Sequence, residues 1–221
     1  GKGAARKYNR DPRLYETMLC VDDDWGGQKV ENWKNQVNGN WAIHTAGPRR
    51  TNGSGSTIIR KFMPGWTSGI PVIGHHFPYI RLPEIYLSYA EALNELGRTT
   101  EAYQYINKVR NRVGLKNIEL VGPWNKESLR EQILIERACE FGFEQVRWFD
   151  IVRHKVSSAF SESLHNVYIT RNSNGTYSYS YPEITFNRRV WWTDFNPKWY
   201  LLPFPLGEIQ KGYGLVQNPG W

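Results

Sequence analysis

The chain has 221 residues, of which 40% are apolar and 22% are charged, a balance typical of a globular protein with a real core. The net charge of +7 comes from scattered basic residues without a long basic run, which disfavours nucleic-acid binding. No segment reaches the roughly 18 to 20 apolar residues of a membrane span, and no signal peptide is present. Ten tryptophans and thirteen tyrosines favour an aromatic binding surface.

Residues 1–21 are basic and then apolar, and a short helix or strand is expected after Asp11-Pro12. The chain opens as if in the middle of a domain, so we expect the C-terminal fragment of a longer protein, with 1–221 forming one domain. The two cysteines, Cys20 and Cys139, match no metal or redox spacing. Two buried free thiols are expected, although a disulfide between them stays open.

Residues 22–79 form a loop-rich excursion, called here the aromatic segment. It contains nine glycines and four prolines with few periodic apolar runs, which is typical of irregular structure. Long loops within compact domains are usually functional or disordered. Disordered segments normally lack tryptophan, and this segment contains four. We therefore expect an ordered, functional excursion.

Residues 80–154 are expected to form two helical hairpins. The first follows the offsets of a tetratricopeptide unit, in which small residues let two antiparallel helices approach closely and a glycine turns the chain. One such hairpin cannot bury its own apolar face, so stacked neighbours are implied. The residues at the template positions are Tyr86, Tyr89, Ala90, Leu93, Gly97, Ala102, Ile106 and Val109.

The second hairpin is less regular. Its first helix has an apolar stripe that includes Leu134, Ala138 and Phe141, and its second helix is expected over roughly 145–154. Residues 155–221 then contain a β-hairpin around Asn174-Gly175 and an aromatic tail. The predicted fold class is mainly α, with tetratricopeptide-like helical hairpins (an α-α superhelix), long irregular loops and a small β-hairpin.

Three glutamates recur every fourth residue, so they are expected to lie on one helical face: Glu136, Glu140 and Glu144. A functional interpretation is a pair of carboxylates for acid–base chemistry, as in a glycosidase. The structural alternative, which we favour, is a lattice of ion pairs that fixes the helix register, because like charges at this spacing repel and require cations. The obvious candidates for these cations are Arg137, Arg147 and Arg153, with Asp150 completing the set.

No motif in the chain demands a metal, a cofactor or catalysis. Asp22, Asp23 and Asp24 are consecutive, whereas a calcium loop alternates its ligands and adds a bidentate glutamate. The pair His75-His76 is weak evidence for a metal site. No serine-nucleophile, phosphate-loop or reactive-cysteine signature occurs. We therefore expect no metal, no cofactor and no enzymatic activity.

The aromatic segment contains the candidate binding site. A tryptophan ring can stack on the C–H-rich face of a sugar, while polar neighbours bind the hydroxyl groups. The alternative for each tryptophan is that it anchors the segment to the core, and for any single one this role is favoured. The candidate ring platforms are Trp25, Trp33, Trp41 and Trp66, and the candidate hydrogen-bond donors are His44 and Arg49.

Several segments, in this order, resemble the C-terminal part of the SusD/RagB family of outer-membrane nutrient-binding lipoproteins. They are YNRDPRL, IRLPEIYLSYAEALNELG with INKVRNRVGL, IERACEFGFEQVRWFDIVRHK, YLLPFPLGEIQ and the terminal QNPGW. Residues 22–79 and 155–195 match weakly. The chain also departs from the family at Gln145, where a glycine is usual, and this puts a left-handed turn there in doubt.

The resemblance implies a helical-hairpin scaffold for irregular loops, held at the bacterial cell surface by a lipid anchor outside this fragment. It implies a protein of the outer membrane that works with a TonB-dependent transporter and binds glycans or peptides without altering them. The family's motifs are structural, so none of its binding residues can be carried over. Glycan capture is the favoured function; peptide capture, or a scaffold that only contacts the transporter, are the alternatives. The sugar, the transporter and the oligomeric state stay open.

Overall fold

The computed structural model describes residues 10–25, 28–31, 33–35, 58–62, 77–160, 165, 167–183 and 195–221. Contacts divide the chain into two compact units. The first consists of Gly1–Arg147 and Asn166–Tyr181, and the second of Trp148–His165 and Pro182–Trp221.

The first unit begins with a short helix, which the sequence predicted as a helix or strand after Asp11-Pro12. This helix, α2 (Arg13–Thr17), leads directly into strand β1 (Met18–Leu19), which pairs antiparallel with β5 (Ile58–Ile59). Between them lie three further two-residue strands. They are β2 (Asp24–Trp25), β3 (Gln28–Lys29), which pairs with β2, and β4 (Lys34–Asn35).

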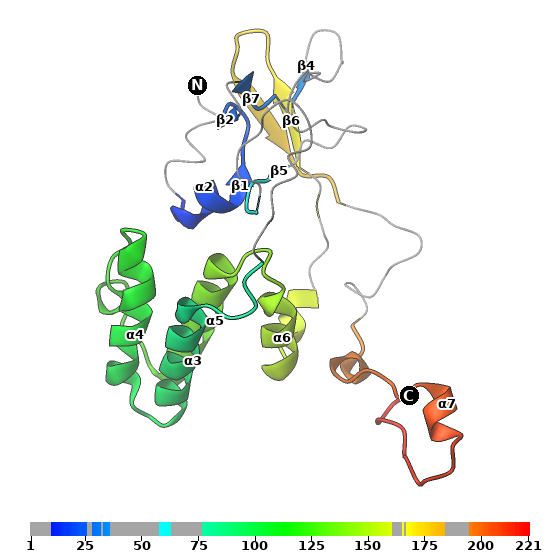
Figure 1. Ribbon diagram of the computed structural model, residues 1–221. Coiled ribbons are helices and arrows are strands. Elements are labelled where there is room, and N and C mark those ends of the chain that lie inside the picture. The colour runs from blue at the N-terminus through cyan, green and yellow to red at the C-terminus, as the bar shows by residue number, and fades with distance from the viewer. Residues whose placement is uncertain are drawn as a thin grey trace. The chain divides into compact units, whose positions relative to one another are not determined.

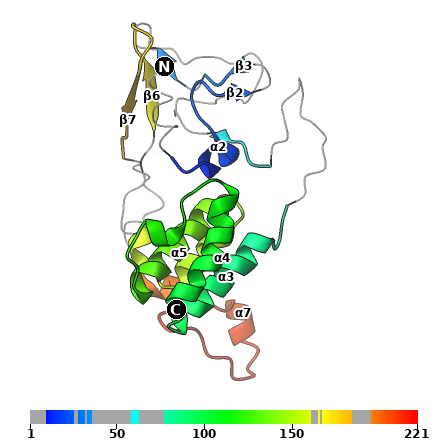
Figure 2. The same cartoon turned by 90° about the vertical axis from the view of Figure 1, so that its left-hand side faces the viewer.

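The helices follow in the order that the sequence predicted (Figure 1). Helix α3 packs against both α4 and α5, and the three lie side by side in both views (Figures 1 and 2). Short 3₁₀ turns cover Ile118–Leu120, Ser157–Phe160 and Pro197–Tyr200. The helices are α3 (Leu82–Glu95), α4 (Thr99–Arg112), α5 (Lys126–Glu140), α6 (Val146–Arg153) and α7 (Leu206–Ile209).

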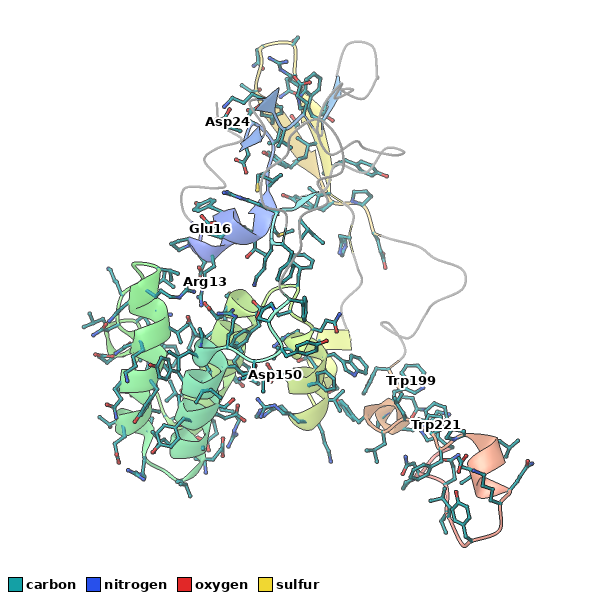
Figure 3. All side chains as sticks on the ribbon, in the orientation of Figure 1. Arg13, Glu16, Asp24, Asp150, Trp199 and Trp221 are labelled. Atoms are coloured by element: carbon teal, nitrogen blue, oxygen red, sulfur yellow. The ribbon has the colours of Figure 1, made fainter. Side chains whose placement is uncertain are left out.

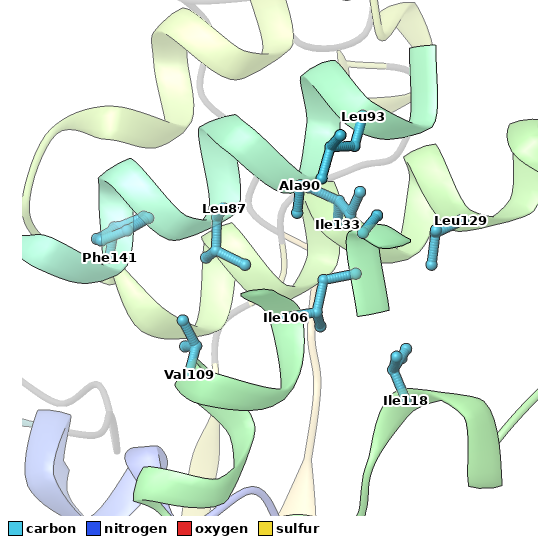
Figure 4. Close-up of a cluster of buried hydrophobic side chains, with 10 residues drawn as sticks. Leu87, Ala90, Leu93, Ile106, Val109, Ile118, Leu129, Ile133 and Phe141 are labelled. Atoms are coloured by element: carbon cyan, nitrogen blue, oxygen red, sulfur yellow. The ribbon is translucent and has the colours of Figure 1, made fainter. Parts of the chain in front are cut away.

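The main apolar core lies between α3, α4 and α5, and the 3₁₀ turn after α4 adds Ile118 to it. Five of the template positions are buried in this core, and Gly97 turns the chain between α3 and α4 with a φ of +76°. Because a β-carbon disfavours this left-handed conformation, glycine is the residue of choice there. Figure 4 shows the cluster, formed by Leu87, Ala90, Leu93, Ala102, Ile106, Val109, Ile118, Leu129, Ile133 and Phe141.

Helix α5 has a well-defined beginning. The side chain of Asn125 accepts a hydrogen bond from the backbone N–H of Ser128 (2.8 Å), and the Ser128 hydroxyl accepts one from the backbone N–H of Asn125 (3.0 Å). This reciprocal capping satisfies two donors that a helix start would otherwise leave without partners. The position of α5 matters because this helix and the turn after it contain the three spaced glutamates.

The predicted β-hairpin forms around Asn174-Gly175, where Gly175 has a φ of +79°. Strand β6 (Tyr168–Arg171) pairs antiparallel with β7 (Tyr177–Ser180), and β4 adds to β6 as a parallel third strand. The predicted fold class, mainly helical with helical hairpins and a small β-hairpin, is confirmed.

Within the part of the chain that the structure describes, no helix is both long and apolar enough to cross a membrane. Cys20 and Cys139 are both thiols, as expected, but each is half-buried and not fully buried. Burial raises the pKa of the Cys139 thiol despite the opposing charge of Arg13.

Candidate functional site

The three spaced glutamates form a buried group, called here the acidic cluster (Glu136, Glu140 and Glu144). Each is at most 7% exposed. Glu136 lies with one carboxylate oxygen 2.7 Å from Nη1 of Arg13, and its other oxygen accepts a 2.8 Å hydrogen bond from Nη1 of Arg110. Both arginines are themselves buried, so the pairs are shielded from water and from screening by salt.

Glu140 is the centre of the cluster. Nη1 of Arg81 donates to it at 2.5 Å, and Nη2 of Arg112 donates to both carboxylate oxygens at 2.8 and 2.9 Å. Burial disfavours the charged form of Glu140. The hydrogen bond and charge of Arg81, with the charges of Arg112 and Arg13, outweigh that effect and lower the pKa of the carboxyl.

Glu144 lies in the turn between α5 and α6, so the prediction that it shares a helical face with Glu136 and Glu140 is wrong: α5 ends at Glu140. Its carboxylate accepts hydrogen bonds from Arg81 at 2.7 and 2.9 Å and forms an ion pair with Lys61. The residues on either side, Phe143 and Gln145, have φ values of +63° and +64°. The left-handed conformation at Gln145, which its departure from the family pattern put in doubt, is therefore present without a glycine.

The expected ion-pair lattice is therefore observed, and it includes cations that the sequence did not suggest. Arg137 donates to the Ser88 hydroxyl (3.2 Å), Arg147 to the carbonyl of Leu134 (3.5 Å), and Arg153 to Asp150 (2.8 Å). The cations that pair with the acidic cluster come from α2, the end of β5, and the termini of α3 and α4. A glycosidase acid needs a raised pKa, whereas that of Glu140 is lowered.

A cleft of about 740 Å³ lies over the acidic cluster. Rings of Tyr15 and Phe62 share its wall with charged groups, a combination suited to ligands that have both apolar faces and polar edges. Sequence reasoning missed this cleft because its walls come from segments far apart in the chain. They are Pro12, Arg13, Tyr15, Glu16, Thr17, Lys61, Phe62, Pro78, Arg81, Arg112, Val113, Glu140 and Glu144.

Trp33 is the predicted ring platform whose side chain the structure describes. It is only 8% exposed, in a second apolar cluster with Val21 and Ile169. The guanidinium of Arg171 lies 5.0 Å from the centre of its ring, within cation–π distance. This burial agrees with the anchoring alternative, and a contact between Trp33 and a ligand stays a prediction.

The structure does not test the other predicted site residues. The backbone of Trp25 lies in β2, where it pairs with Gln28. Trp41, Trp66, His44 and Arg49 lie outside the described residues.

The consecutive aspartates are used in the fold. Asp22 accepts a hydrogen bond from the Tyr177 hydroxyl (2.8 Å), Asp23 accepts one from the backbone N–H of Cys20 (2.8 Å), and Asp24 pairs with Lys29 (2.8 Å). Burial of Tyr177, together with its bond to Asp22, raises the pKa of the phenol. Among the residues that the structure describes, no group of three or more carboxylate, histidine or cysteine side chains is arranged to hold a metal ion.

The fold and the acidic cluster define a helical-hairpin scaffold protein. The model of the SusD family matches residues 4–221. The chain belongs to the SusD family, as the resemblance predicted.

Relatives and solved structures agree with this assignment. SusD-like protein P25 of Formosa agariphila is 32% identical over 139 residues, which are 62% of this chain and 23% of that protein. SusD-like protein P2 of the same organism is 32% identical over 150 residues, 64% of this chain and 25% of that protein. The matched part therefore spans about a quarter of the length of these relatives.

Two crystal structures from Bacteroides fragilis show similar folds. One SusD-like protein has a TM-score of 0.69 and 26% identity, covering 100% of this chain and 41% of that chain. Another, described as a SusD-like carbohydrate-binding protein, has a TM-score of 0.51 and 22% identity, covering 73% of this chain and 32% of that chain. At this identity the second similarity is one of fold alone.

Proposed function

We propose that this chain is part of a non-catalytic, cell-surface glycan-binding protein that delivers its ligand to a TonB-dependent outer-membrane transporter. The observation that carries the proposal is the family match over residues 4–221. A structural relative described as carbohydrate-binding supports the ligand class. Outer-membrane attachment is proposed to come from a lipid anchor in a part of the protein outside this chain.

The proposed ligand site is the aromatic segment, with Trp25, Trp33, Trp41 and Trp66 as ring platforms and His44 and Arg49 as hydrogen-bond donors. The chemistry supports this choice, because an indole face covers the C–H groups of a sugar and leaves its hydroxyls to polar side chains. The described charges elsewhere suit this role less well. The carboxylates of the acidic cluster are already occupied by arginine and lysine.

The test uses the full-length protein on a glycan array, followed by calorimetry with each glycan that binds. Single Trp25→Ala, Trp41→Ala and Trp66→Ala variants remove one stacking ring each. At least one of them is expected to weaken binding tenfold or more, which corresponds to about 1.4 kcal/mol of binding free energy. Trp148→Ala is the control, because Trp148 is 45% exposed but lies outside the aromatic segment.

Unchanged affinity in all three variants, with native circular dichroism, would exclude this site. Binding to a mixed peptide library in place of every glycan would favour the peptide-capture alternative. Co-purification with a transporter, without binding in either screen, would favour a scaffold that only contacts the transporter.

A further inference from the structure

We propose that the acidic cluster is the device that fixes the aromatic segment on the helical hairpins. Three of its cations lie in or beside this segment. Arg13 precedes the segment, Lys61 lies within it two residues after β5, and Arg81 follows it as the N-cap of α3. All three bind carboxylates or carbonyls from α5 and the turn that follows. The inference depends on the proposed function only for its effect on ligand binding.

The first attachment is through Arg13, which is 6% exposed. Its guanidinium lies between two carboxylates. Nη1 is 2.7 Å from an oxygen of Glu136, and Nε donates to Asp11, two residues earlier in the chain, at 2.9 Å. Figure 3 shows Arg13 projecting from α2. Since both carboxylates flank the guanidinium, α2 is held in one orientation on α5, with which it is in contact.

The second attachment is through Lys61. Besides its ion pair with Glu144, its ammonium group donates to the carbonyls of Gly142 (3.0 Å) and Glu140 (3.3 Å). These carbonyls lie at the C-terminal end of α5, where the helix dipole favours a cation. Lys61, two residues after β5, thus satisfies carbonyl groups at the C-terminal end of α5.

The third attachment is through Arg81, which binds both Glu140 and Glu144 and also donates to the Glu140 carbonyl (2.7 Å). Its guanidinium lies 4.6 Å from the centre of the Phe141 ring. The planar guanidinium fixes direction as well as distance, which a lysine could not do. Arg81 therefore holds the start of α3 against the end of α5.

The two strands at the base of the segment are also joined to each other. β1 pairs with β5, the backbone N–H groups of Arg60 and Lys61 donate to the Thr17 carbonyl (2.9 and 3.2 Å), and Nη1 of Arg60 donates to the Tyr15 carbonyl (2.9 Å). Arg13 and Lys61 therefore hold the paired strands β1 and β5 together on α5. Loss of either attachment is expected to weaken the hold on both strands.

The backbone of the turn after α5 fits this role. A β-carbon on Gly142 would lie 3.4 Å from Cγ2 of Thr17, an ordinary van der Waals distance, so this turn lies directly against the end of α2. On either side of Glu144, Phe143 and Gln145 adopt left-handed conformations that non-glycine residues rarely occupy. Such conformations persist where the surroundings determine them strongly, and here they direct Glu144 to Arg81 and Lys61.

Hydrogen exchange in the full-length protein tests the proposal, followed by mass spectrometry from milliseconds to hours. In Glu144→Gln, amides in residues 10–19 and 58–62 are expected to exchange at least tenfold faster, while those of 87–93 and 102–109 stay within twofold of wild type. The control is Glu95→Gln, because Glu95 pairs with Arg130 and Lys126 at a site away from the acidic cluster. This control is expected to leave residues 10–19 and 58–62 unchanged.

A second set of variants separates positioning from general destabilisation. Lys61→Met is expected to reproduce the faster exchange of residues 10–19, and Lys61→Arg is expected to restore most of the protection. Unchanged exchange in Glu144→Gln, or equal acceleration throughout α3 and α4, would overturn the proposal. If exchange changes as expected but no array glycan binds even the wild type, the positioning role stands and the proposed function fails.

Discussion

At Gln145 the chain keeps a left-handed turn in which its family usually has glycine. The side chain is exposed and the φ is +64°. A β-carbon in this conformation costs about 1–2 kcal/mol. The structure holds the strain because Glu144, the preceding residue, is bound by Arg81 and Lys61. The strained Gln145 is therefore adjacent in sequence to Glu144, whose ion pairs hold this turn in place.

The variant Gln145→Gly is therefore expected to raise the free energy of unfolding by about 0.5–1 kcal/mol, the relief of strain less the extra entropy of an unfolded glycine. Urea denaturation of the full-length protein measures it. The matched control is Gln132→Gly within α5, which is expected to lower the free energy of unfolding by about 1 kcal/mol. A loss of stability in Gln145→Gly would show that its side chain has a stabilising contact.

The acidic cluster shows what residue-level sequence reasoning could and could not predict. The spacing of Glu136, Glu140 and Glu144 predicted one helical face and a need for cations, and Glu144 lies beyond the end of the helix. It could not predict the cations, because helical spacing relates only neighbours, whereas Arg13 and Glu140 are separated by 127 positions. The three local arginines were suggested by distance along the chain, and of these Arg153 forms an ion pair with Asp150, three residues away.

At the scale of elements, apolar periodicity predicted the helices well. Small residues such as Ala90 and Ala102 are fully buried where α3 and α4 meet. The β-hairpin also followed from its turn, since Asn-Gly favours the backbone that joins two strands. The parallel pairing of β4 with β6 was not predictable, because Lys34-Asn35 has no alternating pattern and its partner, Thr170-Arg171, is distant in sequence.

An ion pair between elements leads to a pH prediction. Arg130 of α5 donates two hydrogen bonds to the carboxylate of Glu95 of α3. The hydrogen bonding from Arg130, together with that from Lys126, lowers the pKa of Glu95 from 4.5 to about 2. A carboxyl with a lowered folded-state pKa stabilises the fold above its ordinary pKa. That contribution is lost as the pH falls from about 4.5 towards 2.

Wild-type stability is therefore expected to fall more steeply between pH 5 and pH 2 than that of Glu95→Gln. Because the pair is partly exposed, the difference at pH 7 should be only about 0.5–1 kcal/mol. Urea titrations at a series of pH values measure both slopes. Glu131→Gln, an exposed change on α5, is the reference variant, and equal slopes for Glu95→Gln and wild type would contradict the assignment.

At the scale of the molecule, the described residues of the first unit form two separate apolar clusters. One fills the space between α3, α4 and α5, and the other surrounds Trp33 beside the small sheet. Trp33→Ala is expected to accelerate hydrogen exchange in residues 168–180 while sparing 87–109, because large-to-small changes remove local packing. Trp124→Ala is the reciprocal control, since Trp124 packs on the helical core and donates to the Ile118 carbonyl (2.8 Å). Acceleration of both regions in either variant would mean that the clusters unfold as one.

The assignment of the chain to the SusD family came from motifs in the helices and at the C-terminus. We interpret these segments as the scaffold of the protein. The candidate ligand site could not be predicted as firmly. Tryptophan content alone cannot separate a stacking platform from an anchor, and Trp33 has the burial of an anchor. The tryptophan content of a segment favours an aromatic binding site, but only the position of each ring in the structure distinguishes a stacking platform from an anchor.

The pairing of β1 with β5 has a consequence for how such a protein can diversify. The ends of the intervening sequence are held by backbone hydrogen bonds, and the flanking cations fix them to α5. Doubling the length of a flexible closed loop costs only about 0.6 kcal/mol. Between β4 and β5, insertions, deletions and wholesale exchange of side chains should therefore be cheap for folding.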